Sequence, residues 1–347
     1  GPNREYASIK FFLFTLFGSA LMLLGFLALF FLQGSFQIPA LAAMGDGNLA
    51  ETTRNLIFGA LFLGFAIKVP MFPFHTWLPD AHTEAPTVGS VLLAAILLKL
   101  GTYGFIRIAI PLLPHAAIKW APWIGGLAVI GIIYGALCCL AQTDMKRLIA
   151  FSSVAHMGFV MLGIATLTSF GINAAIFGMV AHGLITGMLF FIGGSVQHTF
   201  GTREMSRLGG LLKQAPKMGW VFGFCAMASL GLPGLAGFWG EFPAVLSAYQ
   251  PAPGLSDALF RTFMVIAAIG TVLAAGYLLW MFQRVAFGEP KPEFADAHIH
   301  DVSTMEWIAW TPILLLIVVL GVYPDTIFSL TNDGATHIAN LVKAVGG

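Results

Sequence analysis

The sequence predicts an all-α polytopic membrane protein, and two observations carry this prediction. Of the 347 residues, 58% are hydrophobic and only 10% are charged, whereas soluble domains carry about 25% charged residues. The apolar residues are gathered in runs of about 20, the length that an α-helix needs to cross a bilayer. The net charge of +1 argues against nucleic-acid binding, which requires a concentrated basic surface.

Nine apolar runs are long enough to cross the membrane. We expect these spans at residues 9–32, 55–73, 88–110, 121–142, 148–169, 171–197, 217–249, 260–284 and 306–328.

Two of the nine spans contain helix-breaking residues. Pro70 and Pro73 interrupt the second span, and the glycine-rich segment Gly231–Gly237 interrupts the seventh. Such breaks free backbone groups that must be satisfied by protein or by cavity water, so broken helices often line transport sites. Their recurrence in two halves of the chain is a weak indication of an internal repeat.

Basic residues in the loops predict the orientation of the chain. Lysine and arginine are more numerous on the side that holds Arg4, the turn Asp144–Arg147 and the loop 198–217. Because cytoplasmic loops carry an excess of these residues, we expect this side to face the cytoplasm and the C-terminus to lie on the opposite side.

The chain offers little for metal or redox chemistry. Its three cysteines, Cys138, Cys139 and Cys225, lie in apolar runs without a CxxC pair, so neither a disulfide framework nor a cysteine metal site is expected. The polar segment 285–305 contains a His298-x-His300 pair. Metal binding there is conceivable, but ligand spacing alone is a weak signal, and a solvated loop is the favoured interpretation.

Five ionisable residues in the predicted spans are the candidate functional residues: Lys68, Lys99, His156, His182 and Glu241. A charge at the centre of a membrane helix costs at least about 2.5–3.5 kcal/mol, and such residues usually face a partner or water. Spread over five helices, the set suggests a polar axis across the membrane interior. We predict that these side chains transfer protons, bridged by water or hydroxyl groups.

For the two lysines, structural alternatives remain open. Lys68 directly precedes the Pro70 break and could extend its ammonium to the membrane surface, although the freed carbonyls of the break favour a protonatable site. Lys99 lies near mid-span, where reaching the surface is difficult. A structural ion pair with a neighbouring subunit is its alternative.

The acid and the histidines also have alternatives. Glu241 follows the Gly231–Gly237 break and could stabilise the positive end of the second half-helix. His156 and His182 each stand alone in a span, without the spaced pairs of a haem bundle, and either could be a hydrogen-bonded core residue. Histidine is nevertheless the side chain most easily protonated near neutral pH.

Hydroxyl groups in the same spans could connect these residues. We expect a hydrogen-bonded chain that includes Ser152, Ser153, Thr186 and Ser195.

Two long stretches resemble the antiporter-like membrane subunits of respiratory complex I. They are KVPMFPFHTWLPDAHTEAPTVGSVLLAAILLKLGTYG, which begins at Lys68, and DMKRLIAFSSVAHMGFVMLGI, which begins at Asp144. The motif HTWLPDAHTEAPT, together with LLKLGTYG, is most similar to the M-type subunit of bacterial NADH-quinone oxidoreductase, the counterpart of mitochondrial subunit 4. The resemblance extends over essentially the whole chain.

The resemblance implies a fold of fourteen membrane helices with two inverted five-helix repeats, each with one broken helix. The nine spans then correspond to the sixth to fourteenth helices, so the chain looks N-terminally truncated by five. Residues 1–112 are expected to be the remainder of the first repeat, 113–284 the second repeat, and 285–347 a polar loop, the final membrane helix and a C-terminal tail.

The resemblance also implies a role for each candidate residue. Lys68 matches the broken-helix lysine, Lys99 the connecting lysine, His156 and His182 the central axis, and Glu241 the terminal acid that distinguishes the M type. In the family, a glutamate of the fifth helix partners the lysine that matches Lys68, and the leading segment of this sequence does not supply it.

The expected function is therefore that of a proton-translocating, non-redox subunit of NADH-quinone oxidoreductase. It would hold no cofactor, contact the other membrane-arm subunits, including neighbouring antiporter-like chains, and cross a bacterial plasma (inner) membrane several times. Two alternatives remain: a subunit of a multisubunit Na⁺/H⁺ antiporter or membrane-bound hydrogenase, and a structural membrane spacer that does not pump.

Overall fold

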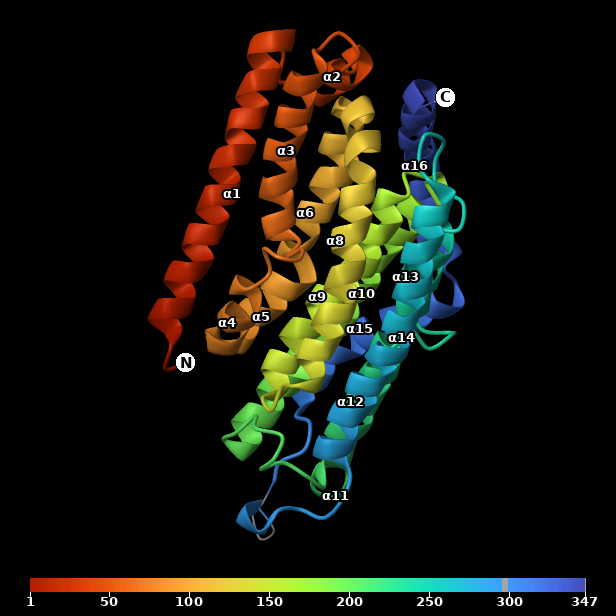
Figure 1. Ribbon diagram of the computed structural model, residues 1–347. Helices are drawn as coiled ribbons and strands as arrows, with labels where there is room; N and C mark the ends of the chain where they lie inside the picture. The colour runs from red at the N-terminus through yellow and green to blue at the C-terminus, as the bar shows by residue number, and fades with distance from the viewer. Residues whose placement is uncertain (295–298, 347) are drawn as a thin grey trace.

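The computed structural model describes residues 1–294 and 299–346, and the regular structure within them is helical. Long helices run side by side along one axis of the molecule (Figure 1). The long uninterrupted helices are α1 (Arg4–Gln33), α8 (Pro114–Leu140), α9 (Met145–Ala165), α10 (Ser169–Phe200), α14 (Asp257–Ala286) and α15 (Thr304–Val322). The chain is thus an all-helical membrane protein, as its composition predicts.

Further helices complete the bundle. They are α2 (Ile38–Met44), α3 (Glu51–Lys68), α4 (Trp77–Glu84), α5 (Thr87–Leu92), α6 (Lys99–Gly104), α7 (Ile110–Leu112), α11 (Leu211–Gln214), α12 (Pro216–Ser229), α13 (Ala236–Ser247), the 3-10 helix η3 (Pro292–Phe294) and α16 (Asp325–Gly346).

In the described residues, seven helices are long and apolar enough to cross a membrane unaided. They correspond to seven of the nine predicted spans. The other two are the predicted broken spans. The span predicted at 55–73 holds most of α3 and the loop that follows it, and α4 lies beyond its predicted end, whereas the span predicted at 217–249 holds α12 and α13.

The first break begins where α3 ends at Lys68. A loop that contains Pro70 and Pro73 leads into α4. The indole Nε1 of Trp77 donates a hydrogen bond to the carbonyl oxygen of Ile67 at 3.0 Å, which satisfies one of the carbonyls that a helix end leaves free. The predicted interruption of this span is confirmed.

The second break separates α12 from α13. Gly231 and Gly234 have φ angles of 81° and 92° there, a left-handed conformation that glycine adopts without steric cost. Glycine at these two positions therefore lets the chain turn between two half-helices, as the sequence predicts.

The span Thr87–Leu112 contains two features that the sequence does not reveal. The π-helical turns η1 (Leu93–Leu97) and η2 (Phe105–Ala109) flank α6, which begins at Lys99. In η1 the backbone N–H of Leu98 donates to the carbonyl of Leu93, an i→i+5 bond of the kind that is frequent at functional sites.

The end of the last predicted span is wrong. Instead of continuing to residue 328, α15 ends at Val322, and Pro324 follows, which cannot continue an α-helix. A further helix, α16, occupies the segment that we expect to be a tail. Its buried residues Ala335, Ile338 and Val342 lie three and four positions apart, so one face packs against the bundle.

Helix α9 forms the centre of the bundle. Its membrane-length window is completely buried inside the protein, whereas that of α1 is 17% buried. Helix α9 packs against α8, α10, α13 and α4. Side chains in this window of α9 are therefore enclosed by the rest of the protein.

The two ends of the bundle carry different loops (Figure 1). The N-terminus, α4 and α11 lie at one end, and α2 and the C-terminus lie at the other. Lys10 pairs with Asp80 at 2.7 Å near the first end, and Lys119 pairs with Glu51 at 2.6 Å near the second. The structure separates the two ends as the sequence assigns them, and which end faces the cytoplasm stays a prediction.

Candidate functional site

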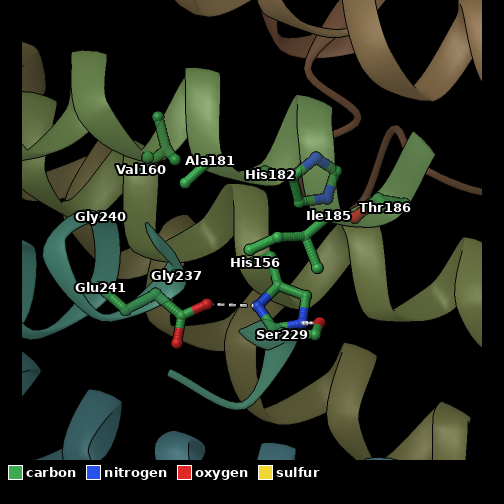
Figure 2. Close-up of a pocket in the computed structure, with 11 residues that line it drawn as sticks. His156, Val160, Ala181, His182, Ile185, Thr186, Ser229, Gly237, Gly240 and Glu241 are labelled. Carbon is green, nitrogen blue, oxygen red and sulfur yellow. Dashed lines mark hydrogen bonds and ion pairs between the residues drawn. The ribbon is translucent and has the colours of Figure 1, made fainter. Parts of the chain in front are cut away.

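His156 of α9 is the centre of a buried hydrogen-bonded cluster. Its Nδ1 lies 2.5 Å from Oε1 of Glu241 on α13, and its Nε2 lies 3.0 Å from the hydroxyl of Tyr277 on α14 and 3.2 Å from Oγ of Ser229 on α12. Figure 2 shows the imidazole between the carboxylate and the serine. Four helices thus meet at a side chain that is only 4% exposed.

The partners of His156 indicate where its proton lies. An ionised carboxylate only accepts hydrogen bonds, whereas a hydroxyl both donates and accepts. A neutral His156 therefore carries its proton on Nδ1, donates it to Glu241, and accepts at Nε2 from a hydroxyl. The ring is set to take up a proton on one side and release one on the other.

A second pair joins Lys99 to His182 of α10. Lys99 Nζ lies 2.6 Å from His182 Nδ1 and donates a further hydrogen bond to the carbonyl oxygen of Ala94 in η1. Because an ammonium only donates, His182 Nδ1 accepts and the ring proton sits on Nε2. Within the described residues, that buried Nε2 has no hydrogen-bond partner.

A small cavity connects the two pairs. The rings of His156 and His182 lie 5.9 Å apart between their centroids, and both line the cavity together with Thr186, Ser229 and Glu241 (Figure 2). About 20 Å³ is open to the centre of a water molecule there, which is room for about one water. One water would extend the hydrogen-bonded sequence from Lys99 to Glu241.

Close backbone contacts set the position of Glu241. A Cβ at Gly240 would lie 2.4 Å from Cα of Gly178 on α10, and a Cβ at Gly237 would lie 2.0 Å from the carbonyl oxygen of Ala228 on α12. Only glycine fits at such distances, so α13 approaches its neighbours closely enough for the Glu241 carboxylate to reach His156.

Lys68 lies apart from this cluster. It is the last residue of α3 and is half-buried. In the part of the chain that the structure describes, its ammonium makes no hydrogen bond or ion pair. The structure therefore brings together four of the five predicted residues and does not link Lys68 to them.

Three of the four hydroxyl groups predicted to connect these residues have partners outside the cluster. Ser152 and Ser153 both donate to the carbonyl oxygen of Ile149 in their own helix, a local bond that serine often makes in helices. Ser195 bonds to Glu306 on α15 instead. Of the four hydroxyls named from the sequence, only Thr186 lines the cavity.

Two polar residues of the cluster were missed by the sequence reasoning. Ser229 precedes the second break, and Tyr277 is fully buried in an apolar span. A tyrosine in the middle of a span is a usable signal, because a buried phenolic hydroxyl normally finds a hydrogen-bond partner.

Two further buried residues were not named as functional. His82 of α4 is fully buried and stacks on Phe190 at a centroid distance of 4.4 Å. Lys146 is 1% exposed, and its Nζ donates to the carbonyl oxygen of Ala85 at 2.6 Å. Lys146 thus satisfies a carbonyl at the C-terminal end of α4.

Part of the candidate metal site lies outside the described residues, since His298 is not among them. Asp301 accepts hydrogen bonds from the backbone N–H groups of Lys217 and Met218, so its carboxylate caps the first turn of α12. Across residues 1–294 and 299–346, no three His, Cys, Asp or Glu side chains gather closely enough to hold a metal ion.

Comparison with known proteins agrees with the family resemblance. Residues 1–278 match the family described as NADH:quinone oxidoreductase/Mrp antiporter, TM. The chain is 41% identical to NADH-quinone oxidoreductase subunit M of Rhodobacter capsulatus over 348 residues, which covers 97% of this chain and 66% of the relative. It is 40% identical to NADH-ubiquinone oxidoreductase chain 4 of Marchantia polymorpha over 337 residues, which covers 97% and 65%.

The chain thus spans about two thirds of the length of these curated relatives. Solved structures share its fold. A chain of respiratory complex I from Thermus thermophilus matches with a TM-score of 0.89 and 32% identity over 98% of this chain and 70% of that one. A chain of the Mrp complex from Dietzia matches with a TM-score of 0.83 over 98% and 69%, and its 20% identity supports the fold alone. The chain belongs to the NADH:quinone oxidoreductase/Mrp antiporter family of transmembrane proteins.

Proposed function

We propose that the chain is a proton-translocating membrane subunit of an NADH-quinone oxidoreductase of the M type. The 41% identity to subunit M of Rhodobacter capsulatus supports this assignment within the family. The contact sequence from Lys99 through His182 and His156 to Glu241 is the observation that carries it. Placing four ionisable side chains in a buried row costs free energy in a membrane, and such residues usually have a function there. Proton transfer is a function that requires this arrangement.

The proposed transfer conserves protons at each imidazole. Lys99 gives a proton to His182 at Nδ1, and His182 releases its Nε2 proton towards the cavity. His156 takes up a proton at Nε2, on the side of Ser229 and Tyr277, and passes its Nδ1 proton to Glu241. Each ring accepts at one nitrogen and donates from the other, which is the arrangement that a proton relay requires.

Lys68 keeps its proposed role as the protonatable lysine of the first break. Lys68 is half-buried and lies at the point where α3 ends and the Pro70 break begins. We propose that it exchanges protons with groups outside the described cluster.

The remaining assignments follow from this function. We propose that the chain itself holds no redox cofactor, and that electron transfer in other subunits drives it through electrostatic and conformational change. Its proposed partners are the other membrane-arm subunits, and its proposed location is the plasma (inner) membrane of a bacterium.

The experiment is proton pumping by membrane vesicles that contain the assembled complex. Lys68→Ala, Lys99→Ala and Glu241→Ala are each introduced, and NADH oxidation, the pH gradient and the amount of complex are measured together. We expect at least one variant to assemble and oxidise NADH while losing most pumping. If all three pump like the wild type, the proposal is wrong.

The same measurement separates the alternatives. A structural spacer predicts intact pumping with poor assembly. A Na⁺/H⁺ antiporter subunit predicts a pH gradient that depends on sodium ions and not on NADH.

A further inference from the structure

The C-terminal end of α15 contacts the break between α12 and α13. The indole Nε1 of Trp239 on α13 donates a hydrogen bond to the carbonyl oxygen of Gly321 at 2.8 Å. Gly321 is buried against the break itself: a Cβ there would lie 2.2 Å from the carbonyl oxygen of Gly234 and 2.4 Å from Cα of Leu235. The two backbones therefore touch, and no side chain fits between them.

The beginning of α16 contacts the same tryptophan. Phe328 lies edge-on to the Trp239 ring at a centroid distance of 6.4 Å and packs on Phe177 of α10 at 5.0 Å. Pro324 separates α15 from α16, so the joint between these helices lies opposite the break between α12 and α13. Trp239 is held by both sides of that joint.

Trp239 and Glu241 lie on different faces of the same short helix. Successive residues of an α-helix are rotated by about 100°. Two residues that are two positions apart are therefore rotated by about 200°, which places these side chains roughly opposite each other. Trp239 faces the α15–α16 joint, and Glu241 faces His156. A movement of the joint against Trp239 would be transmitted across α13 to the carboxylate.

Helix α13 depends on such contacts for its orientation. It has only 12 residues, and its N-cap Leu235 makes no side-chain capping bond. Isolated helices of this length are marginal, and the left-handed glycines of the break do not restrain it. The packing of α13 against neighbouring helices therefore sets where Glu241 points.

We propose that Trp239 and Gly321 form a clasp through which the α15–α16 joint positions Glu241 against His156. Both are positioning residues: neither contacts the imidazole or the carboxylate pair. The clasp rests on the proposed proton-transfer function, and it assigns to the C-terminal helices the alignment of a site that they do not enter.

The test uses the natural chain within its assembled membrane complex. Trp239→Phe removes the indole N–H and keeps an aromatic ring, and Gly321→Ala places a methyl group against the Gly234 carbonyl. Trp220→Phe is the matched control, because Trp220 is 70% exposed and lies away from the break. Gly334→Ala in α16 is the second control, since a Cβ there meets nothing within 4 Å.

We expect Trp239→Phe to assemble at wild-type levels and to pump about two- to tenfold less per NADH oxidised, the factor that corresponds to one hydrogen bond. In Gly321→Ala the backbone of α15 must move away from the break, so we expect a loss of pumping at least as large and less assembled complex. The pH profile of pumping should shift in both, because the carboxylate and imidazole no longer hold each other in one geometry. Both controls should pump with the wild-type profile. If Gly321→Ala does not assemble, Trp239→Phe decides the result.

A double mutant separates positioning from general stability. In a Glu241→Gln background, Trp239→Phe should cause no further loss of pumping, because contacts that act through one group are not additive. An additive loss, or an unchanged pH profile in Trp239→Phe, overturns the clasp. If Glu241→Gln itself pumps like the wild type, the proposed function fails instead, so the two failures are distinguishable.

Discussion

His156 Nδ1 lies 2.5 Å from Glu241 Oε1, and this contact joins the buried membrane-length part of α9 to the half-helix that follows a glycine-rich break. Helix α9 is long and enclosed by protein, so its position is firmly set. Helix α13 is short and follows the glycine-rich break, so its position depends on a few packing contacts. The geometry of the pair is therefore set from the side of Glu241.

Shortening the acid tests how strictly this contact is required. Glu241→Asp keeps the charge but removes one methylene group, so the carboxylate should no longer reach His156 at hydrogen-bonding distance. A positioned acid or base contributes about 10²–10⁴-fold, and a carboxylate that is present but displaced should forfeit part of this, so we expect pumping to fall by about tenfold or more while NADH oxidation continues. Glu51→Asp is the control, since Glu51 is exposed and pairs with Lys119; equal pumping by Glu241→Asp and this control would refute the requirement.

Replacing Lys99 by arginine separates proton transfer from a fixed ion pair. Arginine keeps the positive charge but does not release its proton in proteins. If Lys99 only provides charge for structure, Lys99→Arg should retain activity. We expect assembled complex with most pumping lost, measured as the pH gradient per NADH oxidised. Lys119→Arg, at an exposed ion pair, should pump normally.

Removing the tyrosine hydroxyl tests the other side of His156. Tyr277→Phe deletes the 3.0 Å contact to Nε2 and leaves Ser229 as the remaining hydroxyl partner. We expect a severalfold loss of pumping, in line with about one hydrogen bond, and a larger loss when Ser229→Ala is added. Tyr6→Phe serves as the control, because Tyr6 is 62% exposed. Wild-type pumping by the double variant would show that neither hydroxyl sets the state of His156.

Lys146 offers a prediction about stability. Its buried Nζ donates to the carbonyl oxygen of Ala85, the C-cap residue of α4. Lys146→Met keeps the length of the side chain and removes the donor, so the half-buried carbonyl of Ala85 loses this partner, at a cost of about 0.5–1.5 kcal/mol. The amount of complex that survives heating should fall, as seen on a native gel. Lys217→Met, at an exposed position, should leave it unchanged.

Much of the site could be predicted because buried charge is expensive. Lys99, His156, His182 and Glu241 stand out in apolar spans, and the structure places all four in one connected row. Tyr277 was missed although a mid-span tyrosine is a usable signal, because the sequence does not show which helix its hydroxyl faces or that His156 is its partner. The isolation of Lys68 was missed because span membership says nothing about which helices become neighbours.

For the fold, too, some features could be predicted from the sequence and others could not. Hydropathy located the long spans, and proline and glycine located the two breaks. Helix α16 was not predicted because it is amphipathic: its buried residues Ala335, Ile338 and Val342 stand among polar residues, so no long apolar run marks it. The clasp between Trp239 and Gly321 depends on a contact between segments more than eighty residues apart, which local sequence does not encode.

The π-helical turn η1 has a consequence for the direction of Lys99. A π turn holds one more residue than an α turn of similar height, so every residue after Leu97 is rotated by about 100° from where a regular helix would point it. In a regular α-helix that starts at Thr87, Lys99 would therefore point away from His182, its partner in the structure. Deleting one residue between Leu93 and Leu97 would restore regular α-helical bonding and, by doing so, disconnect the lysine from its histidine. The irregular turn thus sets the direction of Lys99, and the proposed proton path requires the one additional residue that the turn contains.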